Sequence, residues 1–233
     1  MLLSSYRLLL EDPIAFLRLT VLVAFSLVVA ITVHEFSHAL IASGLGDSTA
    51  RRLGRLTLNP VRHLDPSGTV MLLVAGFGWG KPVPVDQHRL RNGRLGMAVV
   101  AGAGPLSNIV AAFLLAIPFK LGILLWDSPG LGQVQYLMNG GLEAGLSDLL
   151  GFVIFFNLLL AVFNLIPLYP LDGAKVLAGL LPPDLAARYS RVERFGPMLL
   201  VALVLADYAS GLGLLLRIIG PIVGGLETVA IGY

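Results

Sequence analysis

Two histidines and a glutamate in the segment His34-Glu35-Phe36-Ser37-His38 have the types and spacing needed to bind and use a metal ion. Residues at positions i and i+4 of a helix lie on one face, one turn apart, so both imidazoles can reach a single zinc ion. Zinc lowers the pKa of its bound water towards neutrality, and a glutamate beside it can accept the proton as the water attacks a polarised carbonyl. The HExxH pattern therefore predicts metal-dependent hydrolysis, with His34 and His38 as ligands and Glu35 as the general base.

A catalytic zinc usually has three protein ligands and one open position, so the sequence must supply a third ligand. We predict Asp172, because it follows an apolar segment and lies in a turn rich in proline and glycine. Asp65 is explained as a turn residue, and His63 and His88 are lone histidines in basic loops. Two alternatives stay open: Asp172 could cap the helix that follows it, and the HExxH residues could be interfacial polar groups without a metal.

The composition predicts that these residues lie in a membrane protein. Of the 233 residues, 56% are hydrophobic and 13% are charged, which leaves too little polar surface for a water-soluble globule. Because the chain has no cysteine, disulfides and thiolate ligands are excluded, and the formal net charge of +2 does not suggest a nucleic-acid partner. We expect an all-α polytopic membrane protein with about four to six transmembrane helices.

Four apolar segments are long enough to cross a bilayer, which takes about 20 residues. They lie at about 17–42, 96–125, 149–168 and 195–219. Short alternating pieces at 51–69 predict a membrane-associated β-hairpin, and the apolar residues 70–77 are too few to span, which indicates a re-entrant or interfacial segment. We expect a single integral-membrane domain over residues 1–233, with its core at 17–183 and a C-terminal hydrophobic segment at 195–231.

The charges of the loops predict the orientation, because cytoplasmic loops collect lysine and arginine. The loops at 47–69, 81–94 and 174–194 are basic, whereas the loop at 127–148 contains acidic residues and neither Lys nor Arg. With the basic loops inside, the HExxH motif and Asp172 lie at the cytoplasmic ends of their spans. We therefore expect a multi-pass protein whose active site faces the cytoplasm.

The two polar motifs together resemble a known family. HEFSH near the end of one span and NLIPLYPLDG (164–173) at the end of another resemble the paired motifs of the site-2 proteases, which are intramembrane zinc metalloproteases. Three further segments resemble the small bacterial and archaeal branch of that family: NP at 59–60, GWGKPVP at 78–84 and GPLSN at 104–108. The resemblance covers roughly residues 21–183, and this combination is far more specific than HExxH alone.

The resemblance implies one zinc ion per chain, with Asp172 as the third ligand, and a role for Asn164 in positioning substrate or stabilising the oxyanion. It implies that residues 51–69 pair with an unwound substrate, since a transmembrane helix hides its peptide bonds until it is unwound. The implied substrates are transmembrane or membrane-associated proteins in the lipid of a prokaryotic cell membrane. We find no PDZ insertion, so we expect a minimal catalytic core.

Two other function classes compete with the protease. A metal-ion transporter could use intramembrane histidines, but such sites lie towards the bilayer midplane, often between internal repeats, and no repeat is apparent. A non-catalytic module that binds membrane segments is not favoured, because Glu35 and every proposed ligand are present. Two polar residues stay open: Asp207 is either functional or a polar break between short helices, and for Asn108 we favour helix packing over support of the site.

Overall fold

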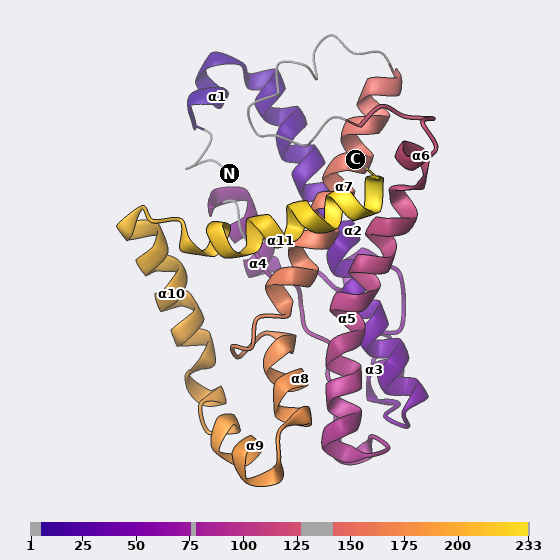
Figure 1. The fold of residues 1–233 in the computed structure, drawn as a ribbon, viewed down its shortest axis with the longest axis vertical. Coiled ribbons are helices and arrows are strands. Elements are labelled where there is room, and N and C mark those ends of the chain that lie inside the picture. Colours follow the sequence, from indigo (N-terminus) through magenta and orange to yellow (C-terminus); the bar gives the residue numbers. More distant parts are fainter. Residues whose placement is uncertain (1–5, 76–77, 127–141, 233) are drawn as a thin grey trace.

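Three long helices form the centre of the molecule, which was analysed as a computed structural model that describes residues 6–75, 78–126 and 142–232. They are α2 (Pro13–Gly44), α5 (Gly93–Leu115) and α7 (Leu142–Asn164), and each packs against the other two (Figure 1). All three are apolar and long enough to cross a membrane, α5 together with the short α6 (Ile117–Lys120) that continues it. The prediction of an all-α membrane protein is thereby confirmed.

The first long helix begins where the sequence supplies a cap. After the short α1 (Tyr6–Glu11), the Asp12 carboxylate accepts hydrogen bonds from the backbone N–H groups of Ile14 (3.1 Å) and Ala15 (2.9 Å). Pro13 occupies the first helical position, where its missing N–H costs nothing. From this start α2 runs for 32 residues without a break, so it carries His34, Glu35 and His38 on one rigid element.

A tight turn after α7 brings Asp172 back towards the bundle. Asp172 is the first residue of α8 (Asp172–Leu180), which packs against α5, and α9 (Pro183–Ser190) and η4 (Glu193–Phe195) follow. A Cβ atom on Gly173 would lie 2.2 Å from the backbone oxygen of Leu165, so this approach of α8 to the end of α7 requires glycine. The turn therefore fixes where the Asp172 carboxylate can point.

The predicted β-hairpin at 51–69 is wrong. In the part of the chain that the structure describes there is no strand, and the one β-bridge between Leu64 and Gly80 is isolated. The segment forms helical turns instead: α3 (Thr49–Arg52), η1 (Pro60–Arg62) and the start of α4 (Pro66–Ala75). The ten residues of α4 are too few to cross a bilayer, as expected of residues 70–77, of which 76 and 77 lie outside the described residues.

Side chains that were expected to alternate on a hairpin satisfy the local backbone instead. Arg55 is buried, and its guanidinium donates to the backbone oxygens of Arg62 and Lys81. The Asn59 side chain accepts from the N–H of Val61 (3.1 Å) and caps η1. Because these bonds hold turns together, the segment has no ladder of strand pairing, and the alternating residues were a misleading signal.

The C-terminal apolar segment is two helices, so the predicted span at 195–219 is also wrong. Helix α10 (Gly196–Ser210) ends at Gly211, and α11 (Leu214–Ile231) begins after Gly213, with both glycines in the left-handed region (φ +65° and +60°). The Asp207 carboxylate accepts from the N–H groups of Leu214 (2.6 Å) and Leu215 (3.2 Å). Asp207 is therefore the polar break between helices, which was one of its two predicted roles.

The helix α11 lies differently from the three long helices. It is the fourth helix that could span a membrane by length and composition, yet in Figure 1 it runs crosswise over the bundle, drawn in yellow. It packs on α7 and α6, where Ile219, Val223 and Ile231 join the main apolar core. In this arrangement three helices, not four, run alongside one another.

Candidate metal centre

Two histidines from α2 and one aspartate from α8 converge in the buried interior. The Nε2 atoms of His34 and His38 lie 2.9 Å and 3.1 Å from the same Asp172 oxygen, Oδ2. All three side chains are buried, and one potential ligand atom of each lies within 4.8 Å of the other two. The structure thus brings together the three residues predicted from the sequence as metal ligands, although 134 residues separate His38 from Asp172.

The hydrogen bonds on the far side of each imidazole leave Nε2 of both rings facing Asp172. His38 Nδ1 lies 2.7 Å from the backbone oxygen of Val100, and His34 Nδ1 lies 2.7 Å from Asn108 Oδ1. A backbone carbonyl only accepts, so Nδ1 of His38 carries a proton, and in the neutral form of the ring Nε2 then has the lone pair that a metal ligand needs. Lone pairs that face a carboxylate repel it unless a cation lies among them.

Asp172 is the third member of the cluster and supplies a carboxylate oxygen that both Nε2 atoms face. Two neutral imidazoles and one carboxylate are a donor set found in catalytic zinc sites. Ligand atoms of a tetrahedral zinc at about 2.0–2.1 Å are roughly 3.3 Å apart, close to the 2.9 Å and 3.1 Å between Asp172 Oδ2 and the two Nε2 atoms.

A glycine on α5 makes room for both imidazoles. A Cβ atom on Gly104 would lie 2.5 Å from His38 Nε2 and 2.7 Å from His34 Nε2. Both contacts are shorter than real Cβ atoms tolerate, so α5 can lie this close to the ligand atoms only with glycine at this position.

Glu35 lies in the same turn of α2 as the ligands, and one of its oxygens is fixed by the extended loop that follows Gly80. Oε2 accepts from the backbone N–H of Val83 at 2.8 Å. Val83 stands between Pro82 and Pro84, neither of which has an N–H, and a residue that precedes proline prefers an extended backbone. The Pro-Val-Pro sequence therefore presents one N–H to Glu35, and the other oxygen is left for a water molecule.

Replacing Val83 with proline removes this N–H. We expect Val83→Pro to lower kcat by about tenfold or more, because a hydrogen bond to a charged group contributes about 1.5–3 kcal/mol. Val83→Ala keeps the N–H and is the matched control. Cleavage kinetics of both variants, at saturating substrate, would decide the point: equal kcat values for the two would mean that Val83 does not position Glu35.

The other candidate residues do not belong to the ligand cluster. The Asn164 amide, at the C-terminus of α7, donates to the backbone oxygen of Leu160 on its own helix (3.0 Å). Asp65 accepts from the N–H groups that begin α4, as expected of a turn residue. His63 is buried rather than solvated and bonds to the Thr57 backbone oxygen, while His88 is exposed. None of His63, His88 and Asp65 joins the three-residue group found in the described chain.

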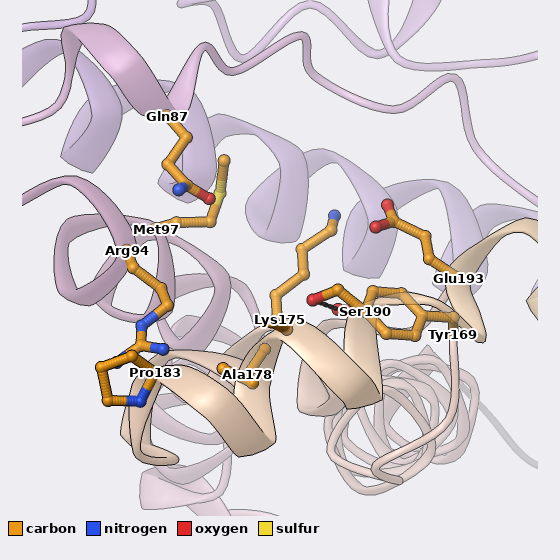
Figure 2. Close-up of a pocket in the computed structure, with 11 residues that line it drawn as sticks. Gln87, Arg94, Met97, Tyr169, Lys175, Ala178, Pro183, Ser190 and Glu193 are labelled. Atoms are coloured by element: carbon orange, nitrogen blue, oxygen red, sulfur yellow. Dashed lines mark hydrogen bonds between the residues drawn. The ribbon is translucent and has the colours of Figure 1, made fainter.

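A cavity of about 310 Å³ lies next to the metal centre, between α5 and η2 (Gln87–Arg89) on one side and α8 and α9 on the other (Figure 2). Lys175 lines it, and the Lys175 ammonium is 3.7 Å from Asp172 Oδ1. Arg94 and Glu193 add further charged groups to the wall. The cavity therefore reaches to within one helical turn of Asp172.

An apolar helical bundle that buries two histidines and a carboxylate beside a glutamate defines a membrane-embedded zinc metalloprotease. The comparisons with known proteins agree. YwhC of Bacillus subtilis (strain 168), named provisionally as a zinc metalloprotease, is 40% identical over 79% of this chain and 80% of its own length. Rip2 of Mycobacterium tuberculosis (strain H37Rv), with the same provisional name, is 30% identical over 86% of this chain and 73% of its own.

The pattern of peptidase family M50 matches residues 129–206, a segment that includes Asn164 and Asp172 but not the HExxH residues. Together with the relatives, it shows that the chain belongs to peptidase family M50, the site-2 protease family. The protein is an intramembrane zinc metalloprotease, and nothing in the comparisons favours the transporter. No solved structure matches the chain.

Proposed function

We propose that this protein hydrolyses peptide bonds in or near transmembrane segments of membrane proteins, with zinc held by His34, His38 and Asp172 and with Glu35 as the general base. The observation that carries the proposal is the convergence of two imidazole Nε2 atoms and one carboxylate oxygen in a buried site, with Glu35 on the same helical turn. We assign this activity to a single domain over residues 1–233, with its core at 17–183.

The zinc ion and the residues of the chain have separate roles in the proposed reaction. A zinc ion bound here supplies a positive charge that acidifies a water molecule and polarises the carbonyl of the scissile peptide bond. The free oxygen of Glu35 accepts the proton of that water and passes it to the leaving amine, while the Val83 N–H holds the carboxylate in place. Burial of the ligands strengthens these electrostatic interactions.

Asn164 is proposed to act on the substrate rather than on the metal. Its amide uses one N–H on Leu160, which orients the group at the end of α7 and leaves the second N–H for a substrate carbonyl. We expect Asn164→Ala to keep zinc affinity within a fewfold of wild type and to lower kcat by about 10²–10³, the range for loss of one oxyanion donor. Single-turnover cleavage and zinc titration check this, and an unchanged kcat would remove Asn164 from the reaction.

We place the site towards the cytoplasm of a prokaryotic cell membrane. Of the 16 lysines and arginines, eight fall at 51–94 and four at 175–194, segments that follow α2, precede α5 or follow α7. The C-terminus of α2, the N-terminus of α5 and helix α9 lie towards the same end of the bundle (Figure 1), and lysine and arginine collect on the cytoplasmic side. The substrate is then cut near the cytoplasmic end of its span.

Because the chain has no cysteine, its orientation can be tested with single-cysteine variants. We expect Arg188→Cys, on α9, to resist a membrane-impermeant thiol reagent in intact cells and to react after permeabilisation. Lys120→Cys, at the opposite end of the bundle, should react in intact cells. Both positions are exposed and both exchanges remove a positive charge, so the pair is matched. The reverse labelling pattern would place the site outside.

The direct test is cleavage of a set of single-span membrane proteins by the purified protein in proteoliposomes. Cleavage within the spans that stops with a chelator and returns with added zinc would support the proposal. Uptake of zinc into the liposomes without any cleavage would favour a transporter instead.

A further inference from the structure

Two buried asparagines on different helices connect His34 to the backbone of the bundle. Asn108 on α5 faces His34 Nδ1 through its Oδ1 (2.7 Å), and its Nδ2 donates to the backbone oxygen of Ala30 (2.9 Å) and to Asn157 Oδ1 (2.7 Å). Asn157 on α7 in turn donates from Nδ2 to the backbone oxygen of Val153 (2.8 Å). Both asparagine side chains are fully buried.

The direction of every bond in this chain follows from its two backbone ends. The oxygens of Ala30 and Val153 can only accept, so each must receive an amide N–H. Asn157 then presents its oxygen to Asn108, and Asn108 presents its oxygen to His34. An oxygen facing Nδ1 requires a proton there, which leaves Nε2 of His34 with its lone pair directed at the metal site.

We propose that Asn108 and Asn157 are a pair of positioning residues that fix the protonation and the orientation of His34 as a zinc ligand. The proposal rests on the proposed zinc centre and adds the residues that hold one of its ligands. His38 needs no such pair, because the Val100 carbonyl fixes its Nδ1 directly. In many zinc sites a carboxylate accepts the second N–H of a ligand histidine. Here two neutral amides take that place, so no further charge is buried among the apolar helices.

Asn108 is tested by two substitutions of similar size. Asn108→Leu removes the acceptor for Nδ1–H, and we expect zinc to bind about 10–100-fold more weakly, the usual effect of losing a partner of a ligand histidine. Asn108→Asp keeps an acceptor for Nδ1–H but loses the N–H groups given to Ala30 and Asn157, and we expect its zinc affinity to fall by about tenfold at most, less than in Asn108→Leu. Equal losses in both variants would show that acceptance from His34 is not what matters, and would overturn the role of Asn108.

Asn157 is tested against a neighbour that contributes only packing. We expect Asn157→Leu, which frees the Asn108 amide to turn, to weaken zinc binding by about tenfold. Leu158→Ala removes a fully buried side chain one residue away and should lower thermal stability without changing the zinc dissociation constant. If Asn157→Leu resembles Leu158→Ala in both measurements, Asn157 only packs the helices and the proposal fails.

Zinc affinity and cleavage, measured separately, distinguish a failure of the asparagine pair from a failure of the metal centre. Zinc dissociation constants are measured by competition with a chelating dye on the purified protein, with no substrate present. The wild-type protein could bind zinc and cleave while Asn157→Leu and Asn108→Leu bind zinc as tightly as it does. That result would overturn the role of the two asparagines and would leave the proposed protease activity unaffected. Wild-type protein that fails to bind zinc would overturn the metal centre itself, and the pair with it.

Discussion

Gly104→Ala should abolish tight zinc binding while leaving the protein folded. The added Cβ would lie 2.5 Å from His38 Nε2 and 2.7 Å from His34 Nε2, so both imidazoles must move off the positions in which they meet Asp172. Alanine is the better helix former, so α5 itself is not weakened. We expect the zinc dissociation constant to rise by about 100-fold or more, at the upper end of effects seen around metal sites.

Gly102→Ala is the matched control on the same helix. A Cβ atom there would meet nothing closer than Val176 Cγ2 at 3.9 Å, which is ordinary contact. Zinc titration and a helical circular-dichroism spectrum of both variants make the comparison. Equal zinc affinity for the two would contradict the placement of α5 behind the ligands.

Glu35→Gln should separate metal binding from catalysis. Glutamine keeps the side-chain oxygen that accepts from the Val83 N–H, so the side chain can stay in place. It cannot accept the proton of the attacking water, and we expect kcat to fall by about 10²–10⁴, the usual contribution of general acid–base catalysis. The zinc dissociation constant should stay within a fewfold of wild type, because Glu35 is outside the three-residue ligand group.

A control for Glu35→Gln is Glu11→Gln, the same exchange at an exposed position on α1. Cleavage by this control at the wild-type rate would show that loss of one negative charge is not the cause. Substantial cleavage by zinc-loaded Glu35→Gln would rule out Glu35 as the general base. Loss of zinc from that variant would instead make Glu35 part of the metal site.

The spans and the proposed ligand set could be predicted from the sequence because each depends on a local pattern. Long apolar runs locate α2, α5 and α7, and HExxH is a one-turn spacing on a helix. Asp172 was assigned from its turn at the end of an apolar segment. The groups that support the ligands lie in segments that the family resemblance singles out, 78–84 and 104–108, but their roles do not follow from it. Asn108, Val83 and Gly104 act through contacts between distant segments, which spacing along the chain does not reveal.

Two failures of sequence reasoning have physical causes. The alternation at 51–69 resembled a strand, but the Arg55 side chain bonds to backbone oxygens of the loop and holds it in turns. The apolar run at 195–219 resembled one span, because hydropathy averages over a break made by two glycines and one carboxylate. A signal was available in the second case, since Asp207 stands shortly before Gly211 and Gly213.

The ligand arrangement also has a consequence for the stability of the chain. One ion held by His34 and His38 on α2 and by Asp172 on α8 would close a loop of well over a hundred residues, in a polypeptide without cysteine for a disulfide. Closing a long loop restricts the unfolded chain. A ligand that binds only the folded protein, at a free concentration of a hundred times its dissociation constant, adds about 2.7 kcal/mol to the free energy of unfolding. Zinc would thus act as a cross-link that ties α8 to α2, and its removal would loosen the same contact that creates the catalytic centre.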